Sequence, residues 1–479
     1  MRLFAGGIRR RLAPLGLGVL LALSPSVAGP ASQAVTLRPL ISDSVLISSA
    51  TPLPTEAQCF AIGRRCFNPT SIRNSYNLGP LHSQGLTGKD QTIVIVDSFG
   101  SATIRSDLNV FNTQFGLQHM CGEANVTCAA GMPTFDTLSI QGTPPATPPP
   151  PNNGTGQEAH NLWALEVALD VEWAHTVAPG ANILLVTTPT AETLGVQGFP
   201  QMMAAERFVI DHHLGSVITQ SFGAAEESFG SFQSLLNLRD AFQAAQAAGI
   251  TVLASSGDFG TANIKKEPVK NPTTLPFPTV IWPASDPLVT AVGGTYLCTD
   301  PTTGLGVDNT HPPVNCQNQA NREVGWIASG GGFSHVFGVP QFQTGTVPGG
   351  STGRGVPDVG YQASARTGVL VFETDEPGGG GWFVVGGTSS GSPQWAGIVA
   401  IADQVNGGPL GYINPALYRI GADPRRYASD FFDVTTGNNQ LDPTIPGFAA
   451  TKGWDAVTGL GTPNAANLVP DLVKAVHGQ

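Results

Sequence analysis

The sequence predicts an α/β fold in which a parallel sheet is covered by helices on both faces. Short apolar runs rich in β-branched residues alternate with amphipathic helical stretches, a pattern typical of strands buried between two helical layers. The expected strands are Thr92–Val96, Asn182–Val186, Ser216–Thr219, Thr251–Ala254 and Val289–Val292. The expected helices are Asn161–His175, Gln201–His213 and Asp240–Ala248. With 479 residues, the chain has ample interior for such a fold.

The composition argues against nucleic-acid binding. Charged residues make up 12% of the chain, about half the usual share in a globular protein. Acidic residues (34) outnumber basic ones (23), the net charge is −11, and the basic residues form no long cluster. Because affinity for a phosphate backbone rests on clustered cations, we expect no nucleic-acid partner.

The N-terminus has the pattern of a signal peptide. Arg2 and Arg9–Arg11 form a positive region, Leu15–Leu23 forms a short apolar run, and Ser26–Ala28 offers a small-residue cleavage pattern. The apolar run is shorter than a membrane-spanning helix requires, which argues against an anchor. We therefore expect residues 1–28 to be removed and the protein to be secreted, to the periplasm or outside the cell, with no membrane contact afterwards.

Six cysteines fall into three pairs that are close in sequence. The pairs are Cys59 with Cys66, Cys121 with Cys128, and Cys298 with Cys316. Export to an oxidising compartment favours three local disulfides. A zinc site is the alternative, but no C-x-x-C is joined by suitable histidines and there is no H-E-x-x-H segment.

The rest of the chain is interpreted as a leader followed by one domain. Residues 29–65 are rich in Pro, Ser and Thr with little periodicity, as in a mobile leader or short pro-segment. Residues 143–156 form a Pro-rich stretch that can be neither helix nor central strand. Strand and helix patterns resume on both sides of this stretch, so we expect a surface insertion within a single domain at residues 66–479.

A serine in a glycine-rich turn is the first candidate for chemistry. Ser389 lies in the turn Gly386–Pro393, directly before the apolar helical run Trp395–Val405. Glycines allow a sharp turn, and a helix N-terminus offers free N–H groups to a developing anion. The alternative is that Ser389 or Ser390 only caps the helix.

Carboxyl groups supply the other candidates. Asp258 lies between two glycines just after an expected strand, where the alternative is a turn-stabilising role. Glu166 and Asp170 are four residues apart on one helix face, and Trp163 and Trp173 fall on that same face at three-residue steps. A carboxyl pair beside indoles is expected to have split pKa values, one group holding a proton that the other has lost. An exposed acidic face is the alternative for this pair.

Together these motifs resemble the sedolisin family, whose members share the subtilisin fold and have a glutamate in place of the histidine base. The matching motifs are the E-x-x-L-D helix at Glu166–Asp170, the oxyanion aspartate in Ser256–Asp258, and the nucleophile turn Gly387–Ser389 with Pro393. Further matching segments are Pro283–Ser285, Val292–Thr295, Ser329–Ser334 and Val356–Val359. The resemblance runs from about Phe67 to about Asn464, with the motifs in the family's order.

The resemblance implies a subtilisin-like catalytic domain and a serine-carboxyl peptidase. Ser389 would be the nucleophile, Glu166 its base, Asp170 the partner of Glu166, and Asp258 a protonated donor in the oxyanion hole. Because a carboxyl near its reference pKa of ~3.9 keeps its proton only in acid, activity is expected at acidic pH. The enzyme would be a monomer that cuts proteins or peptides as an endopeptidase or tripeptidyl-peptidase. The alternative is a secreted binding or structural protein that has lost catalysis.

The sequence argues against a true subtilisin. Val94–Ser98 resembles the subtilisin strand that ends in the catalytic aspartate, but the chain has no H-G-T-H segment, and Gln394 stands where subtilisins have histidine. Asp97 is therefore interpreted as structural or as support for the site. His160 and His175 are interpreted as ordinary helix residues.

The resemblance also implies one structural calcium ion within residues 430–460. Calcium takes oxygen ligands from carboxylates and backbone carbonyls. The carboxylates would come from Asp433 and Asp455. The carbonyls would come from Val434, Thr451 and Gly453. Thr451 stands where the family usually has glycine, and its carbonyl can still serve as a ligand.

Overall fold

The fold is described from a computed structural model. The described residues are 38–39, 43–140, 159–189, 198–266, 273–308, 316, 322–375 and 380–479. They belong to one compact unit, Gln33–Gln479. The predicted signal peptide and most of the predicted leader before Asp43 lie outside the described residues, as does the Pro-rich stretch 143–156.

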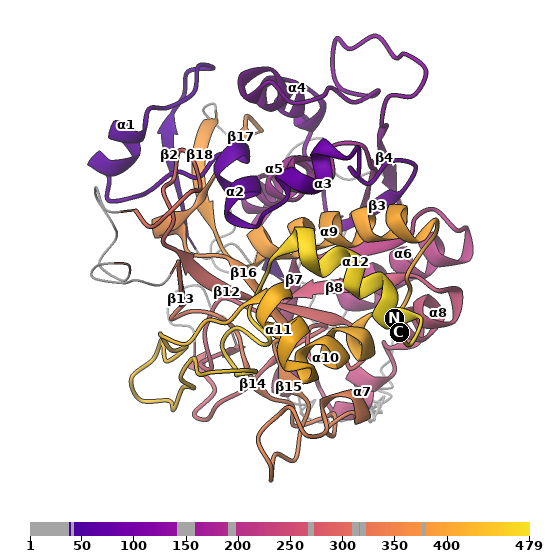
Figure 1. The fold of residues 1–479 in the computed structure, drawn as a ribbon, viewed down its shortest axis with the longest axis vertical. Helices are drawn as coiled ribbons and strands as arrows, with labels where there is room; N and C mark the ends of the chain where they lie inside the picture. The colour runs from indigo at the N-terminus through magenta and orange to yellow at the C-terminus, as the bar shows by residue number, and fades with distance from the viewer. Residues whose placement is uncertain are drawn as a thin grey trace, which may run out of the picture. The chain divides into compact units, whose positions relative to one another are not determined.

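The largest sheet among the described residues has eight strands and carries every predicted strand (Figure 1). Its order is β13-β12-β8-β6-β3-β5-β4, with β16 also beside β12. The strands are β3 (Thr92–Ser98), β4 (Phe135–Ser139), β5 (Asn182–Thr188), β6 (Val217–Gln220), β8 (Thr251–Ser255), β12 (Thr290–Leu297), β13 (Glu323–Gly325) and β16 (Val359–Gln362). All neighbours are parallel except β12 and β13, so the predicted α/β fold with a parallel sheet is confirmed.

Helices cover both faces of this sheet. One face carries α5 (Ala159–Val177) and α9 (Gly391–Asn406), and the other carries α6 (Gly198–Asp211) and α8 (Asp240–Ala248). Alternate residues of β3 point to the two sides, because successive side chains of a strand face opposite ways. Ile93 and Ile95 join the core beside α5 and α9, whereas Val94 and Val96 join the core beneath α6 and α8.

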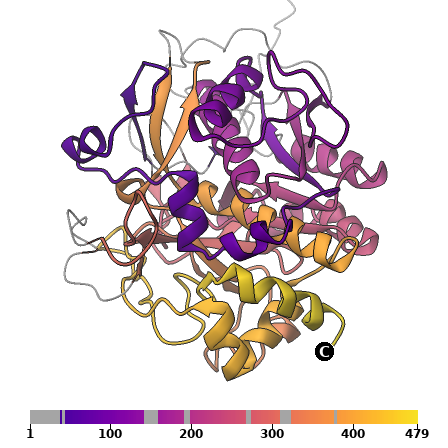
Figure 2. The same cartoon turned by 45° about the horizontal axis from the view of Figure 1, so that its top comes forward.

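Smaller elements complete the domain. On the side of α5 and α9 lie α2 (Pro69–Ser75), α3 (Gly79–Ser83), α4 (Ile104–Phe115) and the C-terminal helices α10 (Asn414–Ala422), α11 (Pro424–Asp430) and α12 (Ala465–Val476), the last three coloured orange to yellow in Figure 2. A second sheet has the order β17-β18-β2, formed by β17 (Val369–Glu373), β18 (Gly381–Gly386) and β2 (Asp43–Ser48). None of the described helices has the length and apolar character needed to cross a membrane.

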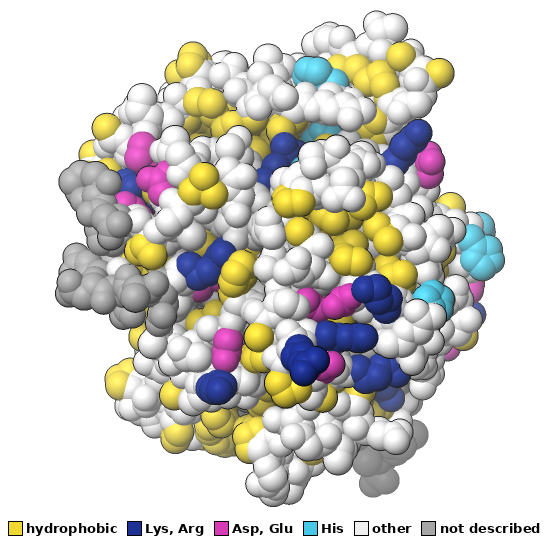
Figure 3. Space-filling view, viewed as in Figure 1, with side chains coloured by type: hydrophobic (Ala, Val, Ile, Leu, Met, Phe, Trp, Pro, Cys, Tyr) yellow, Lys and Arg dark blue, Asp and Glu magenta, His cyan; other side chains and the backbone are white. Residues whose placement is uncertain are grey.

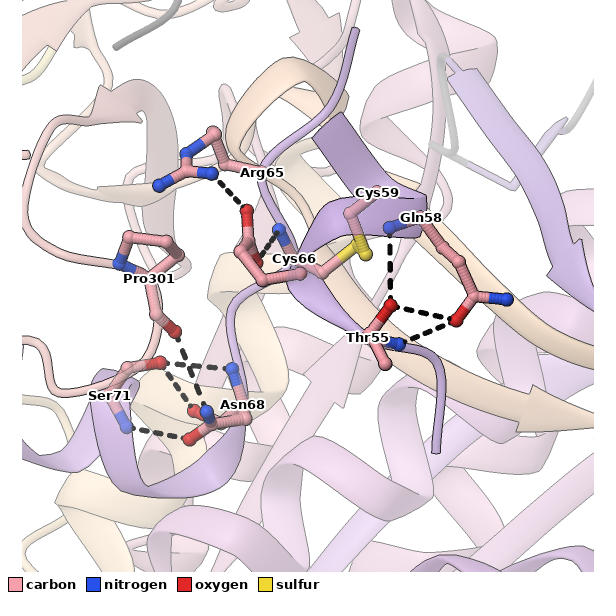
Figure 4. Close-up of a disulfide and its surroundings, with 9 residues drawn as sticks. Thr55, Gln58, Cys59, Arg65, Cys66, Asn68, Ser71 and Pro301 are labelled. Carbon is pink, nitrogen blue, oxygen red and sulfur yellow. Dashed lines mark hydrogen bonds and ion pairs between the residues drawn. A yellow bond between two sulfur atoms is a disulfide. The ribbon is translucent and has the colours of Figure 1, made fainter. Parts of the chain in front are cut away.

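The segment predicted as a leader is folded against the domain from Asp43 onward. Its strand β2 pairs with β18, and its helix α1 (Glu56–Ala61) begins at a capping box formed by Thr55 (Figure 4). Arg65, just beyond α1, forms ion pairs with Glu56 and with Asp308, the latter at 2.7 Å between Nε and Oδ2. The removal of this segment as a leader stays a prediction.

The three predicted disulfides are present. Cys59 is bonded to Cys66, Cys121 to Cys128, and Cys298 to Cys316. The first joins the C-terminal end of α1 to the start of the predicted domain (Figure 4). Each closes a short stretch of chain, with sequence separations of 7, 7 and 18 residues.

Several interior carboxyl groups have no neutralising cation within the described part of the chain. Glu206 is fully buried with no hydrogen-bond partner among the described residues, and burial raises its pKa well above the usual range. Burial also raises the pKa of Glu172, although a hydrogen bond from the Phe372 N–H opposes this rise. Burial raises the pKa of Asp403 to about 7. On the face shown in Figure 3, the few charged side chains of both signs lie among polar and apolar ones.

These buried groups predict a fold that is more stable in acid than at alkaline pH. In the native state they hold protons up to their raised pKa values, whereas in the unfolded chain they lose them near pH 4. Their contribution to stability is complete below about pH 4 and is lost as the pH rises, through about 7 for Asp403. We expect urea unfolding of Ser389→Ala protein, chosen to exclude self-digestion, to need less urea at pH 8 than at pH 4.5.

Glu206→Gln is the matched control, because glutamine keeps the shape of the side chain and does not titrate. This substitution should reduce the difference in urea midpoint between pH 4.5 and pH 8. A urea midpoint at pH 8 equal to or above that at pH 4.5 in the Ser389→Ala protein without the Glu206 substitution would contradict the prediction.

Candidate active site

Ser389 lies where strand β18 turns into helix α9. Gly387 makes the turn with φ 145° and ψ 161°, a conformation essentially limited to glycine. A short 3-10 turn, Thr388–Ser390, then leads into α9. The Ser389 side chain is fully buried, and Oγ makes no standard hydrogen bond within the described part of the chain.

The capping alternative for these serines is not supported. Ser390 is the N-cap residue of α9, but its side chain makes no capping hydrogen bond. The Ser390 hydroxyl instead donates to Gln362 Oε1 at 2.8 Å. The Ser389 hydroxyl therefore lies at a helix N-terminus without being used to hold that terminus.

Asp258 is tied to the residue that precedes Ser389. It follows β8, and Gly257 before it adopts φ 115°. Its Oδ1 accepts hydrogen bonds from the Thr388 N–H and from Thr388 Oγ1, both at 2.8 Å. Its Oδ2 is buried with no partner among the described residues, and burial raises the pKa of Asp258 to about 7 despite the two Thr388 bonds. Below that pH, Oδ2 is the oxygen free to carry the proton.

A glycine-rich segment holds the Asp258 loop in place. Ser256 Oγ donates to the carbonyl of Gly330 at 2.7 Å, and the Gly330 N–H donates to the carbonyl of Gly257 at 2.7 Å. A Cβ at position 330 would lie 2.0 Å from the Ser256 carbonyl oxygen, so only glycine allows this approach. The matching segment Ser329–Ser334 thus has a structural task beside the candidate site.

Helix α5 brings Glu166 and Asp170 to the same place. Both side chains are fully buried, and α5 contacts the Thr388–Ser390 turn. The Ser389 hydroxyl lies close enough to Glu166 to oppose the rise in the pKa of Glu166. The contact is looser than a standard hydrogen bond. Asp170 Oδ1 accepts a hydrogen bond from Ser221 Oγ at 3.1 Å. The exposed acidic face considered for this pair is therefore excluded.

The carboxyl pair cannot be fully ionised. Burial, followed by the charge of Asp170, raises the pKa of Glu166 well above its usual range. Burial, followed by the charge of Asp97, raises the pKa of Asp170 in the same direction, and hydrogen bonds from Ser221 and Glu166 oppose that rise. Desolvation and like charges both disfavour a second negative charge, so one proton is shared within the group over a wide pH range.

Asp97 is a third member of this carboxyl group. It lies near the end of β3, fully buried, with neither carboxyl oxygen hydrogen-bonded within the described part of the chain. Burial raises the pKa of Asp97 to about 8. Sequence analysis assigned Asp97 only a structural or supporting role, because its strand resembles one from a different peptidase family. The electrostatic link to Glu166 and Asp170 comes from the tertiary fold.

The two tryptophans of α5 pack into different cores. Trp173 packs against Phe111 and donates its Nε1 to the Leu370 carbonyl, whereas Trp163 packs near Phe222 in the second core. At about 100° per residue, positions 163, 166, 170 and 173 span about 80° around the helix axis, so the tryptophans and the carboxyl groups lie on the same side of α5.

No described histidine takes the place of the base. His175 Nε2 bonds the Gln118 carbonyl at 2.7 Å, and burial lowers its pKa to about 4. The arrangement around Ser389 thus combines a hydroxyl, a carboxyl group able to accept its proton, and a second carboxyl able to donate one. Those are the components of acyl transfer through a serine nucleophile.

The predicted calcium ligands come from two loops that meet. The Gly453 N–H donates to both carboxyl oxygens of Asp433 at 3.1 and 3.2 Å, and the Thr451 N–H donates to Asp455 Oδ2 at 2.9 Å. Val434 lines the same cavity as Asp433. Two carboxylates and nearby backbone carbonyls are oxygen donors of the type calcium takes. No group of three or more His, Cys, Asp or Glu side chains suited to a metal occurs within the described ranges.

Comparison with known proteins gives no match to a family model but several relatives. The chain is 29% identical over 433 residues to kumamolisin from a Bacillus species, covering 88% of this chain and 66% of kumamolisin. It is 31% identical over 346 residues to tripeptidyl-peptidase 1 of Homo sapiens, covering 67% of this chain and 54% of that protein. The chain thus matches between about half and two thirds of the length of these relatives.

A solved structure shows the same fold. Pseudomonas sedolisin, described as a serine-carboxyl proteinase complexed with two molecules of pseudo-iodotyrostatin, aligns with a TM-score of 0.63 and 26% identity. The alignment covers 85% of this chain and 98% of that structure. With these relatives and this fold, the chain belongs to the sedolisin family.

Proposed function

We propose that the protein is a serine-carboxyl peptidase that hydrolyses peptide bonds in acidic solution. The observation that carries this proposal is the attachment of Asp258 to Thr388, which fixes a buried carboxyl beside the Ser389 turn. Membership in a family whose named members include kumamolisin, tripeptidyl-peptidase 1 and a serine-carboxyl proteinase supports the same activity.

The reaction begins with proton transfer from Ser389 Oγ to Glu166. As the proton leaves, Oγ attacks the carbonyl carbon of the substrate and forms a tetrahedral intermediate. Glu166 then returns the proton to the leaving nitrogen, the C–N bond breaks, and an acyl-serine remains. Water completes the cycle by the same route, with Glu166 as base. Asp170 orients Glu166 and shares the proton of the buried group, as the mutual effects on their pKa values indicate.

Asp258 stabilises the charge that forms on the substrate oxygen. An ionised carboxylate would repel that oxygen, so Asp258 must be protonated to donate a hydrogen bond. Its Oδ1 is already used by Thr388, which leaves Oδ2 to hold the proton. The backbone N–H of Ser389, at the helix N-terminus, is the second donor in the proposal.

Export and calcium binding belong to the same proposal. Three disulfides are typical of an oxidising compartment and support secretion. Asp433 and Asp455, with carbonyls of Val434, Thr451 and Gly453, would hold one calcium ion that joins the two C-terminal loops. When bound, the ion supplies structural cross-linking and takes no part in the reaction. We expect a monomer that acts on proteins or peptides.

Ser389→Ala should lower kcat/KM on an unfolded protein substrate by at least about a thousandfold, because the nucleophile is lost. Digestion at pH 4, followed by mass spectrometry, measures the effect and gives the cleavage pattern. Ser390→Ala is the matched control and should retain activity. Equal digestion by Ser389→Ala and the parent protein, or none by either, would support a catalytically silent protein instead.

Two substitutions of Asp258 should distinguish the need for a hydrogen-bond donor to the substrate oxygen from the need for a protonated carboxyl group. Asp258→Ala removes the donor and should lower kcat by about 10²–10³-fold. Asp258→Asn keeps an N–H donor at every pH while its oxygen still accepts from Thr388. The parent enzyme should lose activity as the pH rises through about 7, where Asp258 ionises. In Asp258→Asn, this fall in activity should move to another pH or disappear. An unchanged pH profile in Asp258→Asn would argue against a protonated Asp258.

Chelation should lower the thermal stability of the protein. Removal of a tightly bound calcium ion with EGTA is expected to reduce Tm by about 3–8 °C, since a ligand that binds only the native state stabilises it by mass action. Calcium should restore Tm, and magnesium should not, because it favours a smaller and more rigid octahedral site. Asp433→Asn should start at the lower Tm and respond weakly to EGTA. No change on chelation in the parent protein would contradict a calcium site here.

A further inference from the structure

Thr388 is the residue directly before Ser389, and its side chain reaches the Asp258 loop. It lies in the 3-10 turn that leads into α9, and it is fully buried. A Cβ built on Gly294 would lie 3.5 Å from the Thr388 methyl carbon, Cγ2. The methyl group therefore packs toward β12, while the hydroxyl faces Gly257 and Asp258.

The Thr388 hydroxyl makes two hydrogen bonds whose directions are fixed. The Gly257 N–H donates to Thr388 Oγ1 at 3.1 Å, because a backbone N–H can only donate. Oγ1 has a single hydrogen, which it donates to Asp258 Oδ1 at 2.8 Å. The Thr388 N–H donates to the same carboxyl oxygen at 2.8 Å. Accepting one bond while donating the other polarises the hydroxyl, which strengthens both bonds.

This pattern keeps the proton of Asp258 away from Oδ1. Both partners of Oδ1 are donors, so a hydrogen on that oxygen would point at another hydrogen and break at least one of the bonds. Oδ2 is buried and has no partner among the described residues. Without the hydroxyl, the single bond from the Thr388 N–H would leave the carboxyl group free to turn about χ2, a torsion with broad preferences in aspartate.

We propose that the Thr388 hydroxyl is a positioning group for the reaction, which holds Asp258 with its Oδ2–H directed to the substrate oxygen beside the Ser389 N–H. The inference rests on the proposed function and adds Thr388 to it. In this arrangement Thr388 makes no contact with the substrate and forms no bond to a reacting atom. It acts through Asp258, because it fixes the orientation of the carboxyl group before the substrate arrives.

The same hydroxyl has an opposite effect on the pH range of activity. Burial raises the pKa of Asp258 to about 7, and the two bonds from Thr388 oppose that rise because they stabilise the ionised form. Loss of the hydroxyl leaves burial less opposed, so Asp258 then keeps its proton to a higher pH. Thr388 thus favours a fast reaction in acid and limits how far activity extends toward neutral pH.

The titratable neighbours of Asp258 are the other carboxyl groups of the site. The charge of Asp258 is one cause of the raised pKa of Glu166, on α5, after burial and the charges of Asp170 and Asp97. No cation within the described part of the chain contributes to the pKa shift of Asp258. Because these groups stay the same when only Thr388 is replaced, a difference between pH profiles reports on Asp258.

Thr388→Val tests the inference, because valine keeps the branched shape that packs toward Gly294 and replaces only the hydroxyl by a methyl group. We expect kcat on a fluorogenic peptide at pH 4 to fall about 10–100-fold, less than in Asp258→Ala, with KM nearly unchanged. At the same time, the loss of activity toward neutral pH should move to higher pH. Thr388→Ser restores the hydroxyl and should recover most of the lost kcat together with the parent pH profile.

A double substitution separates positioning from a general loss of structure. In Asp258→Asn the donor is an amide nitrogen and no proton has to be placed, so adding Thr388→Val should lower kcat by a smaller factor and leave the pH profile as it was. A turn that collapses without the hydroxyl would instead lower kcat by the same factor in both backgrounds, and the single variant would show no shift in its pH profile. That result would overturn the inference.

A measurement without catalysis keeps the inference separate from the proposed function. In Ser389→Ala protein, NMR titration of isotope-labelled aspartates, with Asp258→Asn to identify the signal, should give a higher pKa for Asp258 once Thr388→Val is added. An unchanged or lower pKa would overturn the inference. Digestion by the parent protein with an unchanged kcat in Thr388→Val would also overturn it and leave the peptidase standing, whereas no digestion by the parent protein would overturn the proposed function.

Discussion

The site depends on the desolvation of one carboxyl group. Asp258 is held by two hydrogen bonds to Thr388, both of which stabilise its ionised form, yet burial outweighs them and raises its pKa to about 7. The hydrogen bonds from Thr388 determine which oxygen of Asp258 carries the proton, because they occupy Oδ1 and leave Oδ2 without a partner among the described residues. Burial decides over which pH range the proton stays. Position and charge state of the proposed donor thus have separate physical causes.

The same desolvation acts throughout the molecule. Glu206, Glu172 and Asp403 have no part in the proposed reaction, and burial raises the pKa of each. A chain with 12% charged residues offers few cations to neutralise such groups. In acid they are neutral, which avoids the much larger free-energy cost of burying an unpaired charge. The conditions that keep Asp258 protonated are therefore those in which the rest of the core is most stable.

Much of this was predictable from the sequence because the signals are local. The period of apolar residues predicted strands β3, β5, β6, β8 and β12, the glycines around Ser389 predicted the turn, and the short cysteine spacings predicted the disulfides. The missed features depend on contacts between distant segments. No sequence pattern near Asp97 indicates that its charge raises the pKa of Asp170. The Pro-rich composition before Cys59 likewise does not predict strand β2, which pairs with β18.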